Sequence, residues 1–356
     1  MEKEEKAILW LSMFDFVGVK KALNLINEYG SAIEVLNNVE KLKDLFKSGD
    51  FEKLKSASDF NYLDNFINNC EKQNIKILTY KSNGYPKSLL NIDTKPLVLY
   101  CKGNIKLLNE NGIAIVGTRR ITKYGTEVTT KFTTALAKAG LVIISGLSYG
   151  VDACAHESCL KAKGKTIAVL GCGLNEIYPA TNIPLAEKII ENDGLVISEY
   201  KPNEKPKTYY FPIRNRIIAG LSKGVLIPEA TLKSGSMHTK NYALEYGKEL
   251  YVVPGRVTDI YSFGCNSIIK SLQGCMVLTP EDILSDFNLK YKEENICNIQ
   301  ISIDEQLVLN ILNCDELHYE EILDKCGLDA KTLNTILVKL EMKKLIKKLP
   351  GNFYCK

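Results

Sequence analysis

Apolar residues in the first 70 positions recur at the spacing of helix faces. Ile8, Leu9 and Leu11 form one set, and Leu23 and Ile26 belong to the next. Residues three and four apart lie on the same side of an α-helix, so this pattern predicts amphipathic helices. We therefore expect a helical N-terminal domain over residues 1–72.

A glycine-centred turn lies between these helical patterns. Residues 16–20 read Phe-Val-Gly-Val-Lys and open a helix. The turn looks like one copy of a helix-hairpin-helix, in which N–H groups at a helix N-terminus hold a DNA phosphate. A plain helical hairpin gives the same pattern. With one copy and no net charge over residues 1–100, the pattern favours the plain hairpin over direct DNA contact.

Short β-branched runs replace the helical pattern after residue 73. Two of them, Ile75–Tyr80 and Leu97–Tyr100, flank a polar loop. Seven more alternate with helix-length segments: Ile113–Val116, Leu141–Ser145, Thr166–Leu170, Leu195–Ser198, Val225–Ile227, Leu250–Val253 and Met276–Leu278. Alternating strands and helices predict an α/β domain over residues 73–285, with a mostly parallel sheet and helices on both faces.

The C-terminal residues return to a helical pattern. A polar linker over 286–302 is followed by helical periodicity near 304–313, 319–326 and 329–343. A lysine-rich hairpin, Leu345–Tyr354, closes the chain around a Pro-Gly-Asn turn. Three helices followed by a hairpin are the outline of a winged helix, which we expect over residues 303–356.

Composition limits the class of protein. Hydrophobic residues make up 45% of the chain and charged residues 25%, as in soluble globular proteins. No apolar run approaches the ~18 residues that span a bilayer, and the acidic N-terminus does not look like a signal peptide. We expect a cytoplasmic protein without a membrane segment. The 11 cysteines include no Cys-x-x-Cys pair and there are 3 histidines, so we expect reduced thiols, no metal site and no cofactor.

The positive charge is concentrated in the middle of the chain. Residues 101–285 carry a net charge of +6, whereas residues 286–356 carry −2. All five arginines lie in the middle segment: Arg119, Arg120, Arg214, Arg216 and Arg256. Arginine makes bidentate contacts to phosphate and stacks on bases, so this placement favours a nucleic-acid or phosphate partner over structural ion pairs.

Several glycine turns follow the predicted strands. Gly117-Thr118-Arg119-Arg120 comes after the first strand of the α/β segment, and Ser145-Gly146 comes after the second. Gly171-Cys172-Gly173 follows the third, and Ser234-Gly235-Ser236 opens a later helix. The carboxyl ends of parallel strands share one edge, so these turns are predicted to line one site. Neither Gly-x-Gly-x-x-Gly nor a Walker loop occurs, which favours a polyanion over a buried pyrophosphate.

The segment Tyr209–Gly220 places aromatic residues beside arginines. Phe211 precedes Arg214, Asn215 and Arg216. Rings stack on unpaired bases and guanidinium groups hold phosphates, so this composition favours single-stranded nucleic acid. Asp152 and His156, four residues apart, would share a helix face, and we interpret them as a structural contact in preference to a catalytic dyad.

These motifs, in their order, resemble the DNA-processing protein A family (DprA, also called Smf). The resemblance rests on Ala114–Arg119, Ser145–Asp152 with Ala155-His156, Ala168–Leu174 with Tyr178-Pro179, Ser198–Tyr200, Phe211–Ser222, Lys233–Ser236 and Val253–Gly255. It covers residues 77 to 284. The flanking helical domain, of helix-hairpin-helix or SAM-like type, and the C-terminal winged helix are similar to the family's usual layout.

The resemblance implies an extended Rossmann-like domain and a function without catalysis. Members bind single-stranded DNA, protect incoming DNA and load the RecA recombinase during natural transformation, and they usually form homodimers through this domain. Carried over to this sequence, the DNA pocket would comprise Gly117, Thr118, Arg119, Arg120, Ser145, Gly146, Phe211, Arg214, Asn215, Arg216, Ser234, Gly235, Ser236 and Lys240. We assign Arg119, Arg214 and Arg216 to phosphates, Phe211 to base stacking and Asn215 to a base edge or the backbone.

Two other functions remain open. The same Rossmann-like group includes enzymes that cleave a base from a nucleotide, and Glu229 is the carboxylate near the corresponding turn. A duplex-binding regulator would use the winged-helix lysines Lys343, Lys344, Lys347 and Lys348. The sequence also departs from the family pattern where Tyr149 replaces a usual arginine; Lys240 would restore a charge nearby.

Overall fold

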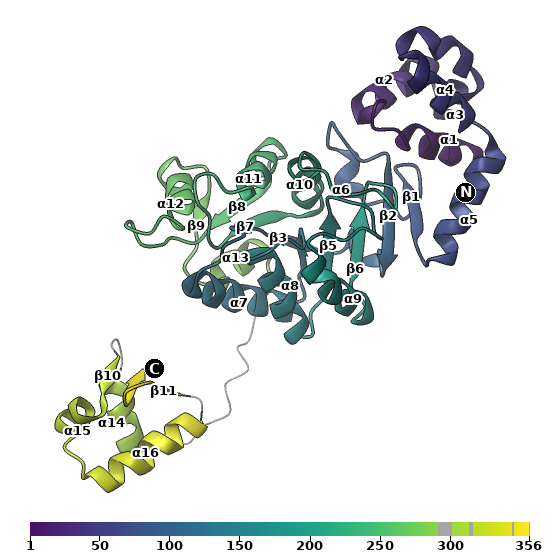
Figure 1. Ribbon diagram of the computed structural model, residues 1–356. Helices are drawn as coiled ribbons and strands as arrows, with labels where there is room; N and C mark the ends of the chain where they lie inside the picture. The colour runs from purple at the N-terminus through teal and green to yellow at the C-terminus, as the bar shows by residue number, and fades with distance from the viewer. Residues whose placement is uncertain (291–300, 313–315, 344, 356) are drawn as a thin grey trace. The chain divides into compact units, whose positions relative to one another are not determined.

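The computed structural model describes residues 1–290, 301–312, 316–343 and 345–355 (Figure 1). The chain forms two compact units, Met1–Tyr291 and Lys292–Lys356. Part of the predicted linker, residues 291–300, lies outside the described residues, as does Lys344. In the described part, no helix has the length and apolar character needed to cross a membrane.

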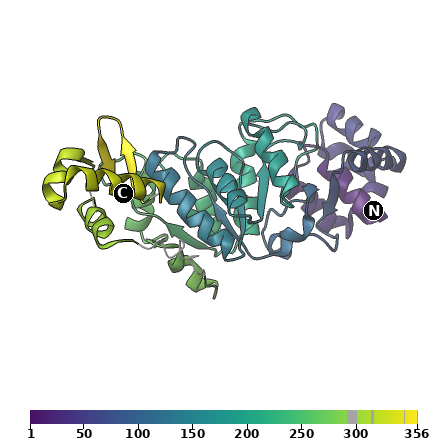
Figure 2. The ribbon, with the colours of Figure 1, turned by 90° about the horizontal axis from the view of Figure 1, so that it is seen from below.

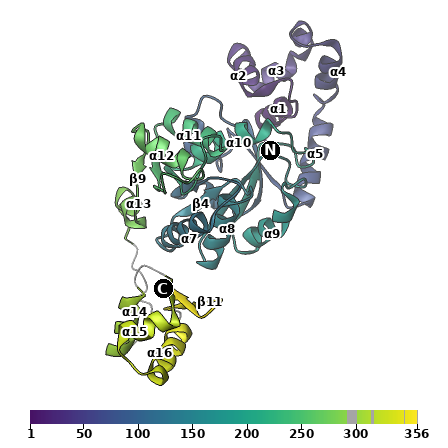
Figure 3. The same ribbon diagram turned by 60° about the vertical axis from the view of Figure 1, so that its left-hand side comes forward.

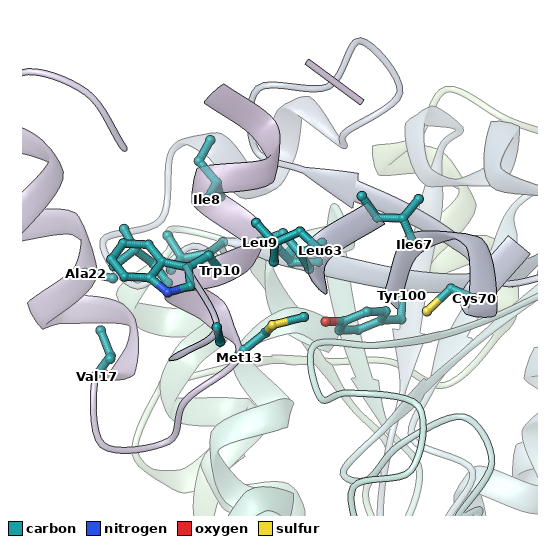
Figure 4. Packing of buried hydrophobic residues seen from close by; sticks show 14 of the residues in the cluster. Ile8, Leu9, Trp10, Met13, Val17, Ala22, Leu63, Ile67, Cys70 and Tyr100 are labelled. Atoms are coloured by element: carbon teal, nitrogen blue, oxygen red, sulfur yellow. The ribbon is translucent and has the colours of Figure 1, made fainter. Parts of the chain in front are cut away.

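The first unit begins with a cluster of helices. They are α1 (Lys3–Ser12), α2 (Gly18–Tyr29), α3 (Ala32–Asn37), the 3₁₀ helix η1 (Val39–Leu45), α4 (Ser48–Ser56) and α5 (Phe60–Lys72). Gly18 opens α2 with a φ of +63°, which explains the glycine in the predicted hairpin turn. Trp10 is fully buried and its indole nitrogen donates to the Leu54 carbonyl oxygen over 2.9 Å. Figure 4 shows this core reaching Tyr100, a residue of the neighbouring sheet.

A nine-stranded sheet forms the centre of this unit, in the order β1-β2-β6-β5-β4-β3-β7-β8-β9. The strands are β1 (Lys76–Thr79), β2 (Val98–Gly103), β3 (Gly112–Ile115), β4 (Val142–Ser145), β5 (Thr166–Leu170), β6 (Leu195–Ser198), β7 (Gly224–Ile227), β8 (Glu249–Val252) and β9 (Cys275–Met276). Strands β3 to β9 pair in parallel, whereas β2 is antiparallel to both neighbours. The predicted mostly parallel sheet is confirmed.

Helices cover both faces of this sheet (Figures 2 and 3). On one face are α6 (Lys87–Leu90), α10 (Tyr210–Leu221), α11 (Ser236–Glu245) and α12 (Phe263–Lys270). On the other are α7 (Lys123–Lys138), α8 (Val151–Lys161), α9 (Ile183–Glu191) and α13 (Pro280–Asp286). The 3₁₀ helices η2 (Ile105–Asn109) and η3 (Ala180–Asn182) lie in connections. Separate apolar cores fill the two layers because parallel strands are buried on both sides.

The strand order reverses direction at β3. After β3 the chain winds through β4, β5 and β6 on one side, and α10 then returns it to β7 on the other side of β3. This is the Rossmann-like arrangement, in which the crevice beyond the reversal point binds ligands.

The second unit is a winged helix, as predicted. Its elements are α14 (Ile303–Ile311), β10 (Leu317–His318), α15 (Tyr319–Cys326), α16 (Ala330–Met342), β11 (Lys347–Leu349) and β12 (Phe353–Cys355). The short strand β10 joins β12 and completes a three-stranded sheet. Lys343 pairs with Glu305 over 2.7 Å, so one of the proposed duplex-binding lysines has an internal partner.

Candidate nucleic-acid interface

A cavity of about 880 Å³ opens at the reversal point, beyond the carboxyl ends of β3 and β7. Its lining comes from the turns after these strands, from α10 and from the loop after β8. The residues around it include Gly117, Thr118, Arg119, Arg120, Ser148, Asp152, Tyr178, Thr208, Phe211, Arg214, Asn215, Lys233, Ser234, Gly235, Ser236, Ile260 and Tyr261. Most of the residues predicted from sequence therefore meet at one place.

The turn after β3 is fixed against the turn after β7. The Thr118 amide donates to the Glu229 carbonyl oxygen over 2.9 Å, and the Thr118 hydroxyl accepts from the Arg120 amide over 3.1 Å. A Cβ on Gly117 would lie 2.6 Å from that same Glu229 oxygen, so the close approach requires glycine. The exposed side chains of Arg119 and Arg120 extend from this rigid turn.

The first residues of the turn after β4 contact a residue that lines the cavity but do not line it themselves. Ser145 is buried and its hydroxyl donates to the Ile115 carbonyl oxygen over 2.6 Å. A Cβ on Gly146 would lie 2.6 Å from the guanidinium of Arg214, so a larger residue would displace that side chain. Ser145 and Gly146 therefore shape the site without lining the cavity.

Helix α10 contributes an aromatic wall. The Phe211 ring centroid lies 5.6 Å from the Arg119 guanidinium carbon and 5.7 Å from the Tyr178 ring centroid. Gly171 leaves room for this ring, because a Cβ there would approach it to 2.9 Å. The half-buried Phe211 thus presents an aromatic face beside a cationic one, which suits a stacked base next to a phosphate.

Arg214, also on α10, is buried, and its guanidinium links the ends of two strands. Its guanidinium donates to the carbonyl oxygens of Gly146, over 2.9 Å, and Val169. Burial lowers the pKa of Arg214, and the neighbouring Asp152 opposes that shift. Burial likewise raises the pKa of Asp152, which Arg214 counteracts. Because its donors are directed at strand ends, Arg214 is held in the cavity floor by the protein itself.

Arg216 lies on another side of α10 and does not line the cavity. Its guanidinium forms a bidentate pair with Glu199, with distances of 2.7 and 2.6 Å, and also donates to the Thr94 carbonyl oxygen over 2.9 Å. At 3% exposure it has no surface to offer a phosphate. The predicted phosphate contact does not fit this position, and we omit Arg216 from the proposed surface.

The remaining predicted residues divide between the cavity and its surroundings. The Asn215 carboxamide accepts from Arg214 over 3.2 Å and donates to the Gly235 carbonyl oxygen over 3.3 Å, so internal bonds hold it. Ser234 and Ser236 share a hydrogen bond of 2.8 Å at the cavity rim. Lys240 lies outside the lining and donates to Gln273 over 2.9 Å.

A family model describes most of this unit. The model of DNA recombination-mediator protein A matches residues 76–288, and a model of the DprA winged helix domain matches residues 300–352. The chain belongs to the DNA recombination-mediator protein A family.

Relatives of this family share substantial sequence with the chain. It is 43% identical over 204 residues to DNA processing protein DprA of Streptococcus pneumoniae, covering 57% of this chain and 71% of that protein. It is 36% identical over 295 residues to protein Smf of Escherichia coli, covering 80% and 78%. The solved structure of S. pneumoniae DprA superposes with a TM-score of 0.69 at 32% identity, covering 82% of this chain and 99% of that one.

A second similar solved structure was described together with its DNA binding. DNA processing protein A from Helicobacter pylori superposes with a TM-score of 0.55 at 36% identity, covering 60% of this chain and 96% of that one. That structure is described in terms of a single-stranded DNA binding mode.

In the present chain, the cavity beyond β3 and β7 is also lined by residues that the sequence analysis did not assign to the site. Tyr178 reaches it from the loop after β5, and Ile260 and Tyr261 reach it from the loop after β8. Both loops follow carboxyl strand ends, and the motifs Tyr178-Pro179 and Val253–Gly255 mark them in the sequence. Because loops after parallel strands meet at one edge of the sheet, their place after β5 and β8 could have assigned these residues to the site.

The histidine and cysteine side chains were also compared with the sequence expectations. Within them, no group of three or more His, Cys, Asp or Glu side chains is placed to hold a metal, and nine cysteines are free thiols. His156 is fully buried on α8, with Nδ1 2.7 Å from the Thr166 hydroxyl. Its hydrogen-bond partner is therefore Thr166, whereas the sequence had suggested a contact with Asp152.

Proposed function

We propose that this chain binds single-stranded DNA at the cavity beyond β3 and β7 and passes it to a RecA-type recombinase during DNA uptake. The observation that carries the proposal is Arg119 lying over the Phe211 ring at the mouth of this cavity. An aromatic face is accessible only to a base that is not stacked within a duplex. The H. pylori relative with a described single-stranded DNA binding mode supports the same ligand.

Charge around the cavity favours a polyanion. Arg119, Arg120 and Lys233 are exposed on its lining, whereas Asp152 is a buried carboxylate beside Arg214. Surface cations that neutralise phosphates release counterions, so affinity should fall with salt.

Fluorescence anisotropy with a labelled strand and its duplex, over a salt series, tests the proposal. We expect tight, salt-sensitive binding of the single strand and weaker binding of the duplex. Equal binding to both forms would contradict it and favour the winged helix as the DNA-contacting part.

Delivery to the recombinase needs a separate test. We propose that the bound strand is released to RecA, so the protein should accelerate assembly of RecA on DNA covered by a single-strand-binding protein. An unchanged assembly rate, with DNA binding intact, would restrict the function to protection of the strand.

The second copy of a homodimer is proposed to bind at the β9 edge of the sheet. Leu272, which is 93% exposed, lies close to this edge, as do the exposed Met276 and Leu278. Strand edges with apolar side chains pair readily with another chain. Leu278→Asp should convert a dimer to a monomer in light scattering, and an unchanged mass would rule out this edge.

Base-cleaving activity is the alternative, and the position of Glu229 does not favour it. This carboxylate is 1% exposed and accepts hydrogen bonds from the Thr122 amide and hydroxyl over 2.9 and 2.5 Å. It thereby holds Thr122, the N-cap residue of α7, and it is not among the cavity-lining residues. Release of free base from nucleotides, abolished by Glu229→Gln, would restore the enzymatic hypothesis.

A further inference from the structure

A smaller cavity of about 240 Å³ lies between the N-terminal helices and α10. The turn between α1 and α2 forms one wall, and the start of α10 forms the other. Its lining includes Asp15, Gly18, Glu199, Tyr200, Tyr209 and Tyr210. The glycine-centred turn noted in the sequence thus borders a cavity next to the DNA site.

Aromatic rings dominate this interdomain cavity. Tyr200 and Tyr210 stack with centroids 3.8 Å apart, and Tyr209 meets Tyr210 edge to face at 4.8 Å. Tyr209 is 55% exposed and Ile213, one helical turn further along α10, is 41% exposed. Stacked tyrosines with an accessible neighbour are the type of surface on which unpaired bases stack.

The charged groups of the interdomain cavity are paired internally. Asp15 accepts from Lys207 over 2.7 Å and from the Tyr210 hydroxyl over 2.6 Å. Glu199 is occupied by the bidentate contact with Arg216. With its carboxylates neutralised and its walls apolar, the cavity suits a flat, uncharged ring better than a phosphate group.

The interdomain cavity is continuous in sequence with the DNA site. Thr208 lines the larger cavity, Tyr209 lines the smaller one and Phe211 returns to the larger one. Successive helix positions are rotated by about 100°, so Tyr209 and Phe211 face different sides of the first turn of α10. The exposed Lys205 lies in the loop that precedes α10.

We propose that the interdomain cavity stacks a second, unpaired base of the strand, one that is not adjacent to the base that stacks on Phe211. The N-terminal helical domain would thereby become part of the DNA-binding surface, through the α1–α2 turn. The inference rests on the proposed single-strand binding function and adds a subsite to it.

The test compares Tyr209→Ala with Tyr209→Phe, which keeps the ring. Both are assayed by anisotropy with a dinucleotide and with a strand of about twelve nucleotides, which lies within the size range of single-strand sites. Tyr209→Ala should weaken binding of the longer strand at least about fivefold, the lower end for loss of one stacked base. It should leave dinucleotide binding and the salt dependence unchanged, and Tyr209→Phe should bind like the wild type.

Fluorescence of 2-aminopurine locates the stacked base. With the probe moved along the longer strand, wild-type protein should quench it at two positions, and Tyr209→Ala should restore fluorescence at one of them. If Tyr209→Ala still quenches the probe at both positions and binds the strand with unchanged affinity, the inference is overturned.

Phe211→Ala, measured beside these variants, distinguishes failure of the second-base subsite from failure of the proposed DNA-binding function. Suppose that Phe211→Ala weakens binding of the dinucleotide and of the longer strand, whereas Tyr209→Ala weakens binding of neither. The inference then fails and the proposed function stands. If neither variant changes binding of either strand, the proposed DNA site itself is wrong.

Discussion

The Arg119 guanidinium lies over the Phe211 ring, with 5.6 Å between its central carbon and the ring centroid. Arg119 comes from the turn after β3 and Phe211 from the first turn of α10, 92 positions later in the chain. The reversal of strand order at β3 brings them together. A guanidinium group and an aromatic ring from distant segments thereby become neighbours at the cavity.

Loss of Arg119 should weaken DNA binding electrostatically. In Arg119→Ala, we expect lower affinity for the single strand and a shallower salt dependence, by about 0.7 in the logarithmic slope for one phosphate contact. Thermal stability should not change, because the side chain is exposed. Anisotropy over a salt series measures both quantities. Lys161→Ala, an exposed charge on α8, is the control, and an equal change in that variant would assign the effect to overall charge.

Loss of the Phe211 ring should weaken binding without altering its salt dependence. Phe211→Ala should cost about 1–3 kcal/mol of binding free energy, because one base loses its stacking partner. The slope should remain that of the wild type, since stacking releases few counterions. Phe211→Tyr keeps the ring and should bind normally. A large loss in Phe211→Tyr would indicate that packing against Tyr178, and not base stacking, is what matters.

Arg216→Ala should act on stability in preference to DNA contact. It leaves Glu199 with an unpaired carboxylate at a buried site, and breaking such a pair costs about 3–5 kcal/mol of unfolding free energy. Urea denaturation measures the change. The double variant Arg216→Met with Glu199→Leu should recover most of it, because neither charge is then left alone. A single variant with wild-type stability and lost DNA binding would return Arg216 to the DNA surface.

His156 should make the protein less stable in mild acid. The Thr166 hydroxyl donates to the Ile143 carbonyl oxygen, so it accepts from Nδ1 of His156, and Nε2 is left buried without a partner. Burial, aided by Arg214, lowers the pKa of His156 from 6.5 to about 3. Below pH 6.5 the unfolded chain therefore binds a proton that the folded chain does not.

This difference sets the direction and size of the pH effect. Each pH unit below 6.5 should remove about 1.4 kcal/mol of unfolding free energy, or about 2 kcal/mol by pH 5. The difference in stability between wild type and His156→Gln, measured by urea denaturation across this range, isolates the contribution. A difference that does not change with pH would show that His156 is protonated in the folded state as well.

Local sequence patterns predicted the strands of the large sheet and the outline of the winged helix, although not its short strand β10. β-branched runs marked the strands because such side chains suit buried parallel sheets, and glycines marked the turns where a Cβ has no room, as at Gly117. The helix–helix–helix–hairpin pattern marked the winged helix. Short-range sterics and hydrophobic periodicity determine these features, so they can be read from neighbouring residues.

The roles of the arginines were decided only by the tertiary structure. Arg119, Arg214 and Arg216 are alike in the sequence, yet one is exposed, one braces strand ends and one pairs with Glu199. A guanidinium binds phosphate only if its donors are not already used, and here the partners are carbonyl groups and a carboxylate from distant segments. The sequence by itself determined where the strands, helices and turns form, whereas long-range packing determined which charges remain available to DNA.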